Sequence, residues 1–434
     1  MKTTALRLYS EKDLRLETFD LPPIKEDEIL IKIISDSLCM SSYKAAMQGA
    51  AHKRVPNDAA VNPIIIGHEF CAEIVTVGAK LTNQYHAGQR VSLQTSLKGT
   101  YNAPGYSFRY IGGNSTYGII PSQYIEAGNL LDYNGDAIFY GSLSEPLSCV
   151  IGATHACYHT IQGEYTHAMD IKKGGNIAIL AGAGPMGLAL IDYLIHRDLR
   201  PSLLVVTDID ANRLARASHV LPPQRAEQSA TIGEPARTDV NLMYINTADI
   251  ADPAAHLREL TGGVGYDEVF VFAPVPSVVE QGDAILAYDG CLNFFAGPTN
   301  PAFSALFNFY NVHYNTTHVV GTSGGNTDDM REALRLAGQR RINPAVLVTH
   351  VGGLDAAKDA TLNLPHIPGG KKLIYNHISL PLSAIDDFEK LGETDPLFKR
   401  LHELCAEAGG LWNAEAERYL LANAPKLNAD KYII

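Results

Sequence analysis

The most constraining feature of the sequence is a region between residues 176 and 297 in which short apolar runs alternate with helical patterns. The apolar runs are IAILAG, LLVVTD, VNLMYI, DEVFVF and CLNFFAG, and segments such as LALIDYLI and NRLARASHV separate them. Fully apolar strands spaced by helices are typical of a parallel sheet that is covered on both faces. The region therefore predicts an α/β domain, and residues 221–238 are interpreted as a polar surface loop within it.

A glycine-rich turn follows the first apolar run. GAGPMG matches the GxGxxG pattern, and it stands between a predicted strand and a predicted helix, which is the context that gives the pattern its meaning. Gly182 permits the tight turn, Gly184 lets a pyrophosphate approach the backbone, and Gly187 lets helix and strand pack closely. A turn that only packs is the alternative. The predicted dinucleotide-binding residues of this turn are Gly182, Gly184, Pro185, Met186 and Gly187.

An acidic residue ends the next predicted strand. Asp208 closes LLVVTD, 21 residues after Gly187. A carboxylate at this place binds the ribose hydroxyls of NAD and repels the additional phosphate of NADP. The sequence therefore predicts that NAD(H) is preferred. Arg213 is a cation that could accommodate NADP(H), so that cofactor is not excluded.

The regions that flank the α/β domain show a different pattern of predicted strands and helices. Residues 1 to about 150 contain short predicted strands such as Ile29–Ile34, Ala72–Val77 and Arg90–Leu93, and a helix is expected to begin around Pro146 and to run towards His159. At 434 residues the chain is too long for one ordinary core. We expect one domain from residues 1–150 and 313–380, a second from 151–312, and a helical C-terminal extension over 381–434, in which Asp395-Pro396 and Asn413 mark two helix starts.

Four residues of the first 150 are candidate metal ligands. They are Cys39, His68, Glu69 and Glu145. Thiolate, imidazole and carboxylate together suit zinc, and a catalytic zinc needs about three protein ligands and one open position. A lone cysteine is usually a small apolar side chain, however, and a lone histidine is usually structural. Spacing alone therefore leaves both interpretations open.

Several motifs that occur in a fixed order favour the interpretation that these residues bind a metal. SLCMSS at Cys39, GHEF at Gly67, AGQRV at Ala87, EPLSC at Glu145, GAGPMG, and GLDAAKDA before KKLIY occur in this sequence. With them, residues 1 to about 375 resemble the medium-chain dehydrogenase/reductase family. Because Glu145 stands where alcohol dehydrogenases carry a cysteine, the chain is most similar to the polyol branch, and within it to reductases of L-sorbose 1-phosphate. The resemblance implies a GroES-like, mostly β catalytic domain and a Rossmann domain.

The resemblance also implies roles for the site residues. Cys39 and His68 bind one catalytic zinc, Glu69 is a third ligand or lies just behind the metal, and Glu145 is a ligand directly or through water. Cys149 is a rival ligand one helical turn after Glu145.

A second set of residues is implied to move the proton. Ser41 takes the place of the hydroxyl that passes the proton, and Lys44 stands where relatives often have histidine. Two neighbouring positions depart from the family pattern, with Met40 in place of glycine and Ser42 in place of aspartate. Residues 95–116 contain no cysteine, so a structural zinc is not expected.

The expected reaction is hydride transfer between NAD(H) and a ketose phosphate, with L-sorbose 1-phosphate reduced to D-glucitol 6-phosphate. Lys44, Lys98 and Arg109 are candidates for binding the substrate phosphate, although single lysines and arginines are more often solvated surface charges. An unphosphorylated polyol dehydrogenase of the sorbitol type is the alternative enzyme. A non-catalytic NAD(H)-binding sensor is an alternative of another class, and the complete set of metal and relay residues disfavours it.

Charge and composition restrict the partners. The formal net charge is −12, which disfavours nucleic acid, and the N-terminus has no apolar signal segment, so a cytoplasmic protein without membrane association is expected. A homodimer or homotetramer is implied by the resemblance, because relatives pair through edge strands of the cofactor domain. CLNFFAG at Cys291–Gly297 is the candidate edge, and a buried core strand is the alternative.

Overall fold

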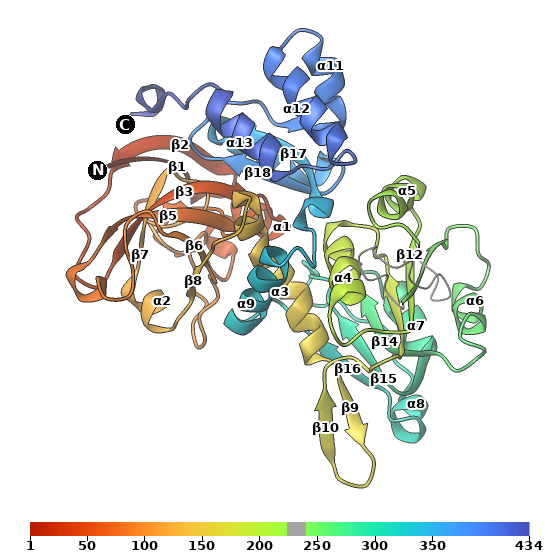
Figure 1. The fold of residues 1–434 in the computed structure, drawn as a ribbon. Coiled ribbons are helices and arrows are strands. Elements are labelled where there is room, and N and C mark those ends of the chain that lie inside the picture. The colour runs from red at the N-terminus through yellow and green to blue at the C-terminus, as the bar shows by residue number, and fades with distance from the viewer. Residues whose placement is uncertain (224–239, 434) are drawn as a thin grey trace. The chain divides into compact units, whose positions relative to one another are not determined.

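The computed structural model describes residues 1–223 and 240–433. Within this range the chain forms two compact units (Figure 1). Unit 1 comprises Met1–Pro146, Asn326–Gly338 and Leu347–Ile434, and unit 2 comprises Leu147–Gly325 and Gln339–Val346. The polar loop predicted at residues 221–238 lies almost entirely outside the described residues.

Unit 2 is built on a parallel six-stranded sheet in the order β13-β12-β11-β14-β15-β16. Its strands include the apolar runs of the sequence. The strands are β11 (Asn176–Leu180), β12 (Leu203–Asp208), β13 (Asn241–Asn246), β14 (Tyr266–Val271), β15 (Leu286–Phe294) and β16 (His318–Gly321). The order reverses between β11 and β14, so the carboxyl ends of these two strands form the point where such sheets bind ligands.

Helices connect the parallel strands of unit 2, and a hairpin precedes the sheet (Figure 1). The helices are α4 (Pro185–His196), α5 (Ala211–Val220), α6 (Pro253–Glu259), α7 (Pro276–Ala284) and α8 (Phe309–Tyr314), and the hairpin strands are β9 (Tyr158–Ile161) and β10 (Thr166–Met169). The uncharged stretch from Ile177 to Ile191 is a strand, a turn and the start of a helix. Among the described residues, no helix is long and apolar enough to cross a membrane.

The edge of this sheet differs from the prediction. CLNFFAG lies in and just after β15, which pairs with β14 on one side and β16 on the other, so the prediction that it forms the edge was wrong. A strand that is apolar on both faces is stable only when it is covered and paired on both sides. The edge strand is β16, which lies beyond the domain boundary predicted at residue 312 because it hydrogen-bonds to β15 and completes the sheet.

Unit 1 carries two sheets. A three-stranded sheet has the order β2-β1-β4, and a larger sheet has the order β19-β17-β18-β3-β5-β6-β8, with β7 also pairing with β3. The strands are β1 (Lys2–Ser10), β2 (Asp13–Asp20), β3 (Ile29–Ser37), β4 (Ile64–Ile65), β5 (Phe70–Val77), β6 (Arg90–Leu93), β7 (Tyr117–Ile120), β8 (Leu130–Asp132), β17 (Val348–Gly353), β18 (Lys371–Tyr375) and β19 (Ser383–Ala384).

The helices of unit 1 are short except for α3, which continues into unit 2. They are α1 (Met40–Gln48), α2 (Ser122–Glu126), α3 (Ile138–Ala156), α9 (Thr327–Gly338), α10 (Ala357–Leu362), α11 (Phe388–Gly392), α12 (Pro396–Glu407) and α13 (Ala414–Asn423). The prediction that a helix begins around Pro146 was wrong, because α3 starts two turns earlier and Pro146 lies inside it.

The C-terminal extension packs on unit 1 rather than forming a unit of its own. Its two predicted helix starts are confirmed: the Asp395 side chain accepts a hydrogen bond from Leu397 N, and the Asn413 side chain accepts from Glu415 N and Ala416 N. The link to the rest of unit 1 is a buried polar network. Trp412 Nε1 donates to Tyr375 Oη at the end of β18, and Tyr375 Oη donates to Glu417.

Candidate active site

Three of the predicted metal ligands meet in unit 1. Cys39 is the N-cap residue of α1, directly after β3, and His68 and Glu69 precede β5, which pairs with β3. One donor atom from each of Cys39, His68 and Glu69 lies within 4.8 Å of the others. Adjacent antiparallel strands thus bring together residues that are about thirty positions apart in the sequence.

Hydrogen bonds orient the imidazole of His68. Its Nδ1 lies 3.2 Å from Ser42 Oγ, and its Nε2 lies 3.2 Å from Tyr106 Oη and 3.4 Å from Ser41 Oγ. Burial lowers the pKa of His68, so the ring is neutral, which is the form that binds metals. With Nδ1 held by Ser42, Nε2 is the nitrogen that faces Ser41 and Tyr106. Ser42, which departs from the family pattern, therefore serves as the hydrogen-bond partner behind the ring.

Glu69 has a partner that the sequence did not predict. Lys371 Nζ, at the start of β18, lies 2.5 Å and 2.6 Å from the two carboxylate oxygens of Glu69, and both side chains are buried. The backbone N–H of Glu69 also donates to Asp36 Oδ1, and Asn114 Nδ2 donates to Asp36 Oδ2. Burial raises the pKa of Asp36 well above its ordinary value. Lys371 therefore compensates the charge of Glu69.

Glu145 lies on α3, in the part of the helix that belongs to unit 1, and it is 9% exposed. Burial raises its pKa to about 7, His68 lowers that pKa, and Glu69 and Cys39 raise it. Burial and Glu69 likewise raise the pKa of the Cys39 thiol. Lys371 lowers the pKa of all three groups, so two carboxyl groups and a thiol lie in the field of one buried lysine. Cys149 lies on the part of α3 that belongs to unit 2.

A hydroxyl pair adjoins the ligand group. Ser41 Oγ lies 3.0 Å from Cys39 Sγ, and Tyr106 Oη donates to Ser41 Oγ over 2.8 Å. Tyr106 is almost completely buried, and burial followed by the charge of Cys39 raises its pKa well above 10. The phenol therefore stays protonated and remains a donor. Lys44 lies on α1, one helical turn after Ser41.

Two glycines allow the backbones to approach here. Gly67 has φ +91°, and a Cβ on it would lie 2.6 Å from the backbone nitrogen of Asn114 and from Asp36 Oδ2. Gly105 has φ +84°, and a Cβ on it would lie 2.1 Å from the Gly67 carbonyl oxygen. Any side chain at either position would separate the loop that carries Tyr106 from the segment that carries His68.

The predicted dinucleotide turn forms in unit 2 between β11 and α4. Gly184 is the N-cap residue of α4, and Pro185 and Met186 begin the helix. A Cβ on Gly187 would lie 1.9 Å from the Gly182 carbonyl oxygen, so close packing requires glycine there, whereas the space beside Gly184 is open. An open backbone at a helix N-terminus is the arrangement that receives a pyrophosphate.

Asp208 is buried at the end of β12, beside this turn. Its Oδ2 accepts a hydrogen bond from Ala183 N, and its Oδ1 accepts from Ile209 N and Asp210 N. These bonds hold a carboxylate against the glycine-rich turn, as the sequence predicted. Arg213 lies on α5, is largely exposed, and pairs with Asp210 at 3.7 Å.

Comparison with known proteins decides the family. Residues 25–127 match the alcohol dehydrogenase GroES-like domain, and residues 241–339 match the zinc-binding dehydrogenase family. Mannitol-1-phosphate 5-dehydrogenase of Aliivibrio fischeri is 50% identical, with 97% of each chain covered. L-sorbose 1-phosphate reductase of Klebsiella pneumoniae is 47% identical, with 99% of each covered, and uncharacterized protein YggP of Escherichia coli is 53% identical, with 97% of each covered.

The chain belongs to the zinc-type medium-chain dehydrogenase family. Solved structures agree on the fold. 2R,3R-butanediol dehydrogenase from Bacillus subtilis has a TM-score of 0.69 at 20% identity, covering 86% of this chain and 99% of that one. L-idonate 5-dehydrogenase from Escherichia coli has a TM-score of 0.64 at 16% identity, covering 86% and 98%. Unit 1 is the GroES-like domain of this dehydrogenase, and unit 2 is its Rossmann domain.

A zinc-type dehydrogenase uses zinc and a nicotinamide nucleotide, and both fit the residues described above. The donor set of thiol, imidazole and carboxylate suits zinc, and its three donor atoms lie close enough together to bind one ion. In the part of the chain that the structure describes, Cys39, His68 and Glu69 form the one group of three such donors within reach of a single ion.

The cations predicted to bind substrate fall in different surroundings. Lys44 is half-buried on α1 near Ser41, whereas Lys98 and Arg109 are exposed. The Arg109 guanidinium lies 5.4 Å from the centre of the Tyr110 ring. The sequence reasoning missed Tyr106 and Lys371. Of these, Lys371 had a signal, because a lysine that begins an apolar run such as KKLIY requires a buried partner.

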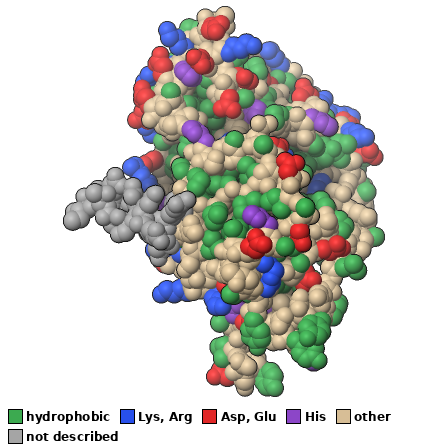
Figure 2. Space-filling view, turned by 90° about the vertical axis from the view of Figure 1, so that its right-hand side faces the viewer, with side chains coloured by type: hydrophobic (Ala, Val, Ile, Leu, Met, Phe, Trp, Pro, Cys, Tyr) green, Lys and Arg blue, Asp and Glu red, His purple; other side chains and the backbone are tan. Residues whose placement is uncertain are grey.

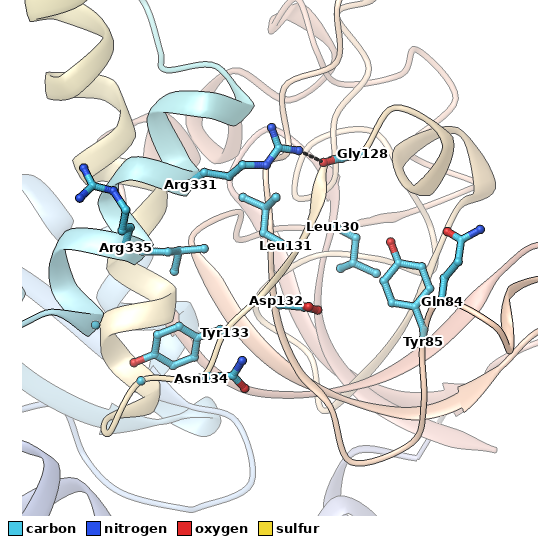
Figure 3. A pocket seen from close by; sticks show the side chains of 13 residues that line it. Gln84, Tyr85, Gly128, Leu130, Leu131, Asp132, Tyr133, Asn134, Arg331 and Arg335 are labelled. Carbon is cyan, nitrogen blue, oxygen red and sulfur yellow. Dashed lines mark hydrogen bonds between the residues drawn. The ribbon is translucent and has the colours of Figure 1, made fainter.

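Unit 1 also contains an open hollow of about 780 Å³ between β8 and α9 (Figure 3). Tyr85, Tyr133, Arg331 and Arg335 are among the residues that line it. Arg331 donates to the Gly128 carbonyl oxygen and pairs with Asp328, so its charge is already compensated. None of the predicted site residues lines this hollow, and we assign it no role.

Proposed function

We propose that this dehydrogenase transfers a hydride between NAD(H) and the carbonyl carbon of a ketose phosphate, with L-sorbose 1-phosphate and D-glucitol 6-phosphate as the expected pair. The observation that carries the proposal is the coverage of the relatives. Two relatives named for sugar phosphates are 47% and 50% identical over nearly the whole chain. Sorbitol dehydrogenase of Bos taurus is 27% identical over only 50% of this chain.

The residues of unit 1 take the following roles in the proposal. Cys39, His68 and Glu145 would hold the zinc, and Glu69 would not be a direct ligand, since Lys371 Nζ already contacts both of its carboxylate oxygens. When bound, zinc supplies the Lewis acid that polarises the substrate carbonyl, and the reduced nicotinamide supplies the hydride. Residues of the chain itself then deliver the proton to the substrate.

Ser41 donates the proton to the reacting oxygen as the alcohol forms. Its hydroxyl is next to Cys39 Sγ, and the Tyr106 hydroxyl donates to it, which orients the Ser41 lone pairs and proton. Lys44, one turn further along α1, completes the proposed relay to solvent. Oxidation of the alcohol uses the same groups in reverse.

The nucleotide is proposed to be NAD(H). The carboxylate of Asp208 is held beside the glycine-rich turn by Ala183 N, where it would bind ribose hydroxyls and repel a phosphate. The positive charge of Arg213 would instead favour the phosphate of NADP(H), but Asp210 pairs with Arg213.

The test is an NADH-oxidation assay with L-sorbose 1-phosphate, fructose 6-phosphate, fructose 1-phosphate and the free ketoses. Fructose 6-phosphate is included because the Aliivibrio relative is named for position 5 of mannitol 1-phosphate. A clear preference for a phosphorylated ketose supports the proposal. Equal kcat/KM values for phosphorylated and free sugars would favour the polyol dehydrogenase alternative instead.

We also infer that two copies pair through the edge strand β16. Figure 2 shows hydrophobic side chains exposed on one face of the molecule. β16 is the edge strand of the sheet, and a hollow of about 570 Å³ lined mostly by apolar residues adjoins it. Exposed apolar residues occur within β16 and in the segment that precedes it. They include Leu306, Phe309, Tyr310 and Val319. Antiparallel pairing of two β16 strands would cover both edges at once. Light scattering should report twice the chain mass or more, and Val319→Asp should reduce it to 47 kDa.

A further inference from the structure

Arg54 is a cation near the proposed zinc ligands that no motif singled out. It follows α1 in a loop, and its side chain is half-buried. Its guanidinium carbon lies 5.0 Å from the centre of the Tyr106 ring. Because Tyr106 Oη contacts both Ser41 Oγ and His68 Nε2, a single tyrosine ring separates this charge from the proton relay.

Within the described part of the chain, no ion pair compensates the charge of Arg54. Among the described residues, no carboxylate lies within ion-pair distance of its guanidinium, although other half-buried or buried arginines, such as Arg7 and Arg197, have acidic partners. The loop itself is held by the backbone: Ser107 Oγ donates to the Arg54 carbonyl oxygen, and Arg54 N donates to His52 Nδ1. The guanidinium thus keeps its planar fork of donors available.

The field of this cation reaches the site. Arg54 is among the causes that lower the pKa of His68 and of His52, and among those that lower the pKa of Tyr106 against the effect of burial. A partly desolvated charge is screened less than an exposed one, which separates Arg54 from Lys98 and Arg109.

We propose that Arg54 is the specificity-determining residue that receives the phosphate group of the substrate. This inference rests on the proposed function and refines it. A guanidinium fork matches two phosphate oxygens at once, and the Arg54 guanidinium lies over the ring of Tyr106, next to the proton relay. An anion bound there would supply the counter-charge that the described residues do not. A neutral polyol would leave this cation unpaired.

The experiment compares kcat/KM for a ketose phosphate with kcat/KM for the corresponding free ketose. Arg54→Met keeps an unbranched apolar side chain and removes the charge, and Arg54→Lys keeps the charge without the fork. Arg90→Met is the matched control, since Arg90 is also half-buried, its guanidinium carbon lies 5.6 Å from the centre of a tyrosine ring (Tyr133), and it has no role in the proposed site. We expect Arg54→Met to reduce the preference for the phosphorylated sugar about tenfold to a hundredfold. The loss should fall on KM rather than kcat, with Arg54→Lys intermediate and Arg90→Met unchanged.

The outcomes separate this inference from the proposed function. If the wild-type enzyme prefers the phosphorylated ketose and Arg54→Met retains that preference, the assignment of Arg54 is overturned and the proposed function stands. If the wild-type enzyme shows no preference for the phosphorylated ketose, both the assignment of Arg54 and the proposed function are overturned. A loss that affects the free ketose equally would mark Arg54 as structural. Inhibition by inorganic phosphate, competitive with the ketose phosphate and weakened in Arg54→Gln, is a second measurement should Arg54→Met fold poorly.

Discussion

Glu417 of the C-terminal extension offers the sharpest test of how the fold supports the site. It is almost completely buried on α13, and its carboxylate accepts hydrogen bonds from Ile138 N at 2.5 Å, Phe139 N at 2.9 Å and Tyr375 Oη at 2.8 Å. The first two donors are N–H groups in the first turn of α3, where the helix itself offers no acceptor. A residue nearly 280 positions away therefore caps the helix that carries Glu145.

The cost of removing this cap can be worked from these contacts. Glu417→Ala leaves two N–H groups and one buried hydroxyl without their acceptor, and each buried unsatisfied group costs about 1–3 kcal/mol. Part of this is offset, because burial raises the pKa of Glu417 to about 7 from an ordinary 4.5, so the ionised form is itself disfavoured. We expect a net loss of roughly 3–5 kcal/mol in the free energy of unfolding at pH 5.5.

The pH dependence has a definite sign. Because the pKa of Glu417 is higher in the folded protein than in the unfolded chain, the folded state binds more protons between pH 4.5 and about 7. Its contribution to stability is therefore complete below pH 4.5 and is lost as the pH rises through about 7. That loss amounts to roughly 3 kcal/mol. Glu417→Ala should remove it, so the variant and the wild type should differ less at pH 8 than at pH 5.5.

The assay is urea unfolding followed by the fluorescence of Trp412, the single tryptophan of the chain, which belongs to the same network. Glu415→Ala, an exposed position on the same helix, is the control. Bound zinc, measured on the folded variant, should also fall, since α3 carries Glu145. Unfolding within about 0.5 kcal/mol of the wild type at pH 5.5, together with unchanged zinc, would refute the reasoning.

Three further predictions concern the metal, the nucleotide and acid stability. Elemental analysis should find about one zinc per chain, and Cys39→Ala should lose the zinc and turnover while still binding NADH, so a reproducible value of two would contradict the single site. NADH should exceed NADPH in kcat/KM by about a hundredfold, and Asp208→Asn should narrow that ratio; equal use of both cofactors by the wild type would show that Asp208 does not govern the choice. His377 is half-buried near Lys32, and burial lowers its pKa to about 4, so its contribution to stability is present above pH 6.5 and is lost as the pH falls through 4. His377→Gln should therefore reduce the fall in the free energy of unfolding between pH 6.5 and 4, measured by chemical unfolding. An unchanged fall would show that His377 does not cause the loss of stability in acid.

The sequence by itself determined the features that depend on near neighbours. The parallel strands of unit 2 include its apolar runs, and GAGPMG forms the predicted turn because its glycines meet positions within a few residues of themselves, as Gly187 meets Gly182. The starts of α12 and α13 were predictable for the same reason, since Asp395 and Asn413 cap N–H groups two or three residues ahead. Cys39 and His68 were predicted through motifs whose spacing a family preserves.

Only the tertiary structure decided what depends on distant partners. The start of α3 was not predictable because its cap, Glu417, comes from the other end of the chain. The order of the last two strands depends on the pairing of β15 with β16. The pattern of apolar and polar side chains along a strand does not say which strand it will pair with. Lys371 and Arg54 carry the same charge, but burial beside Glu69 makes Lys371 part of a structural ion pair, whereas Arg54 lies over Tyr106 and has no acidic partner among the described residues. Charge is a local property of the sequence, and its compensation is a property of the fold.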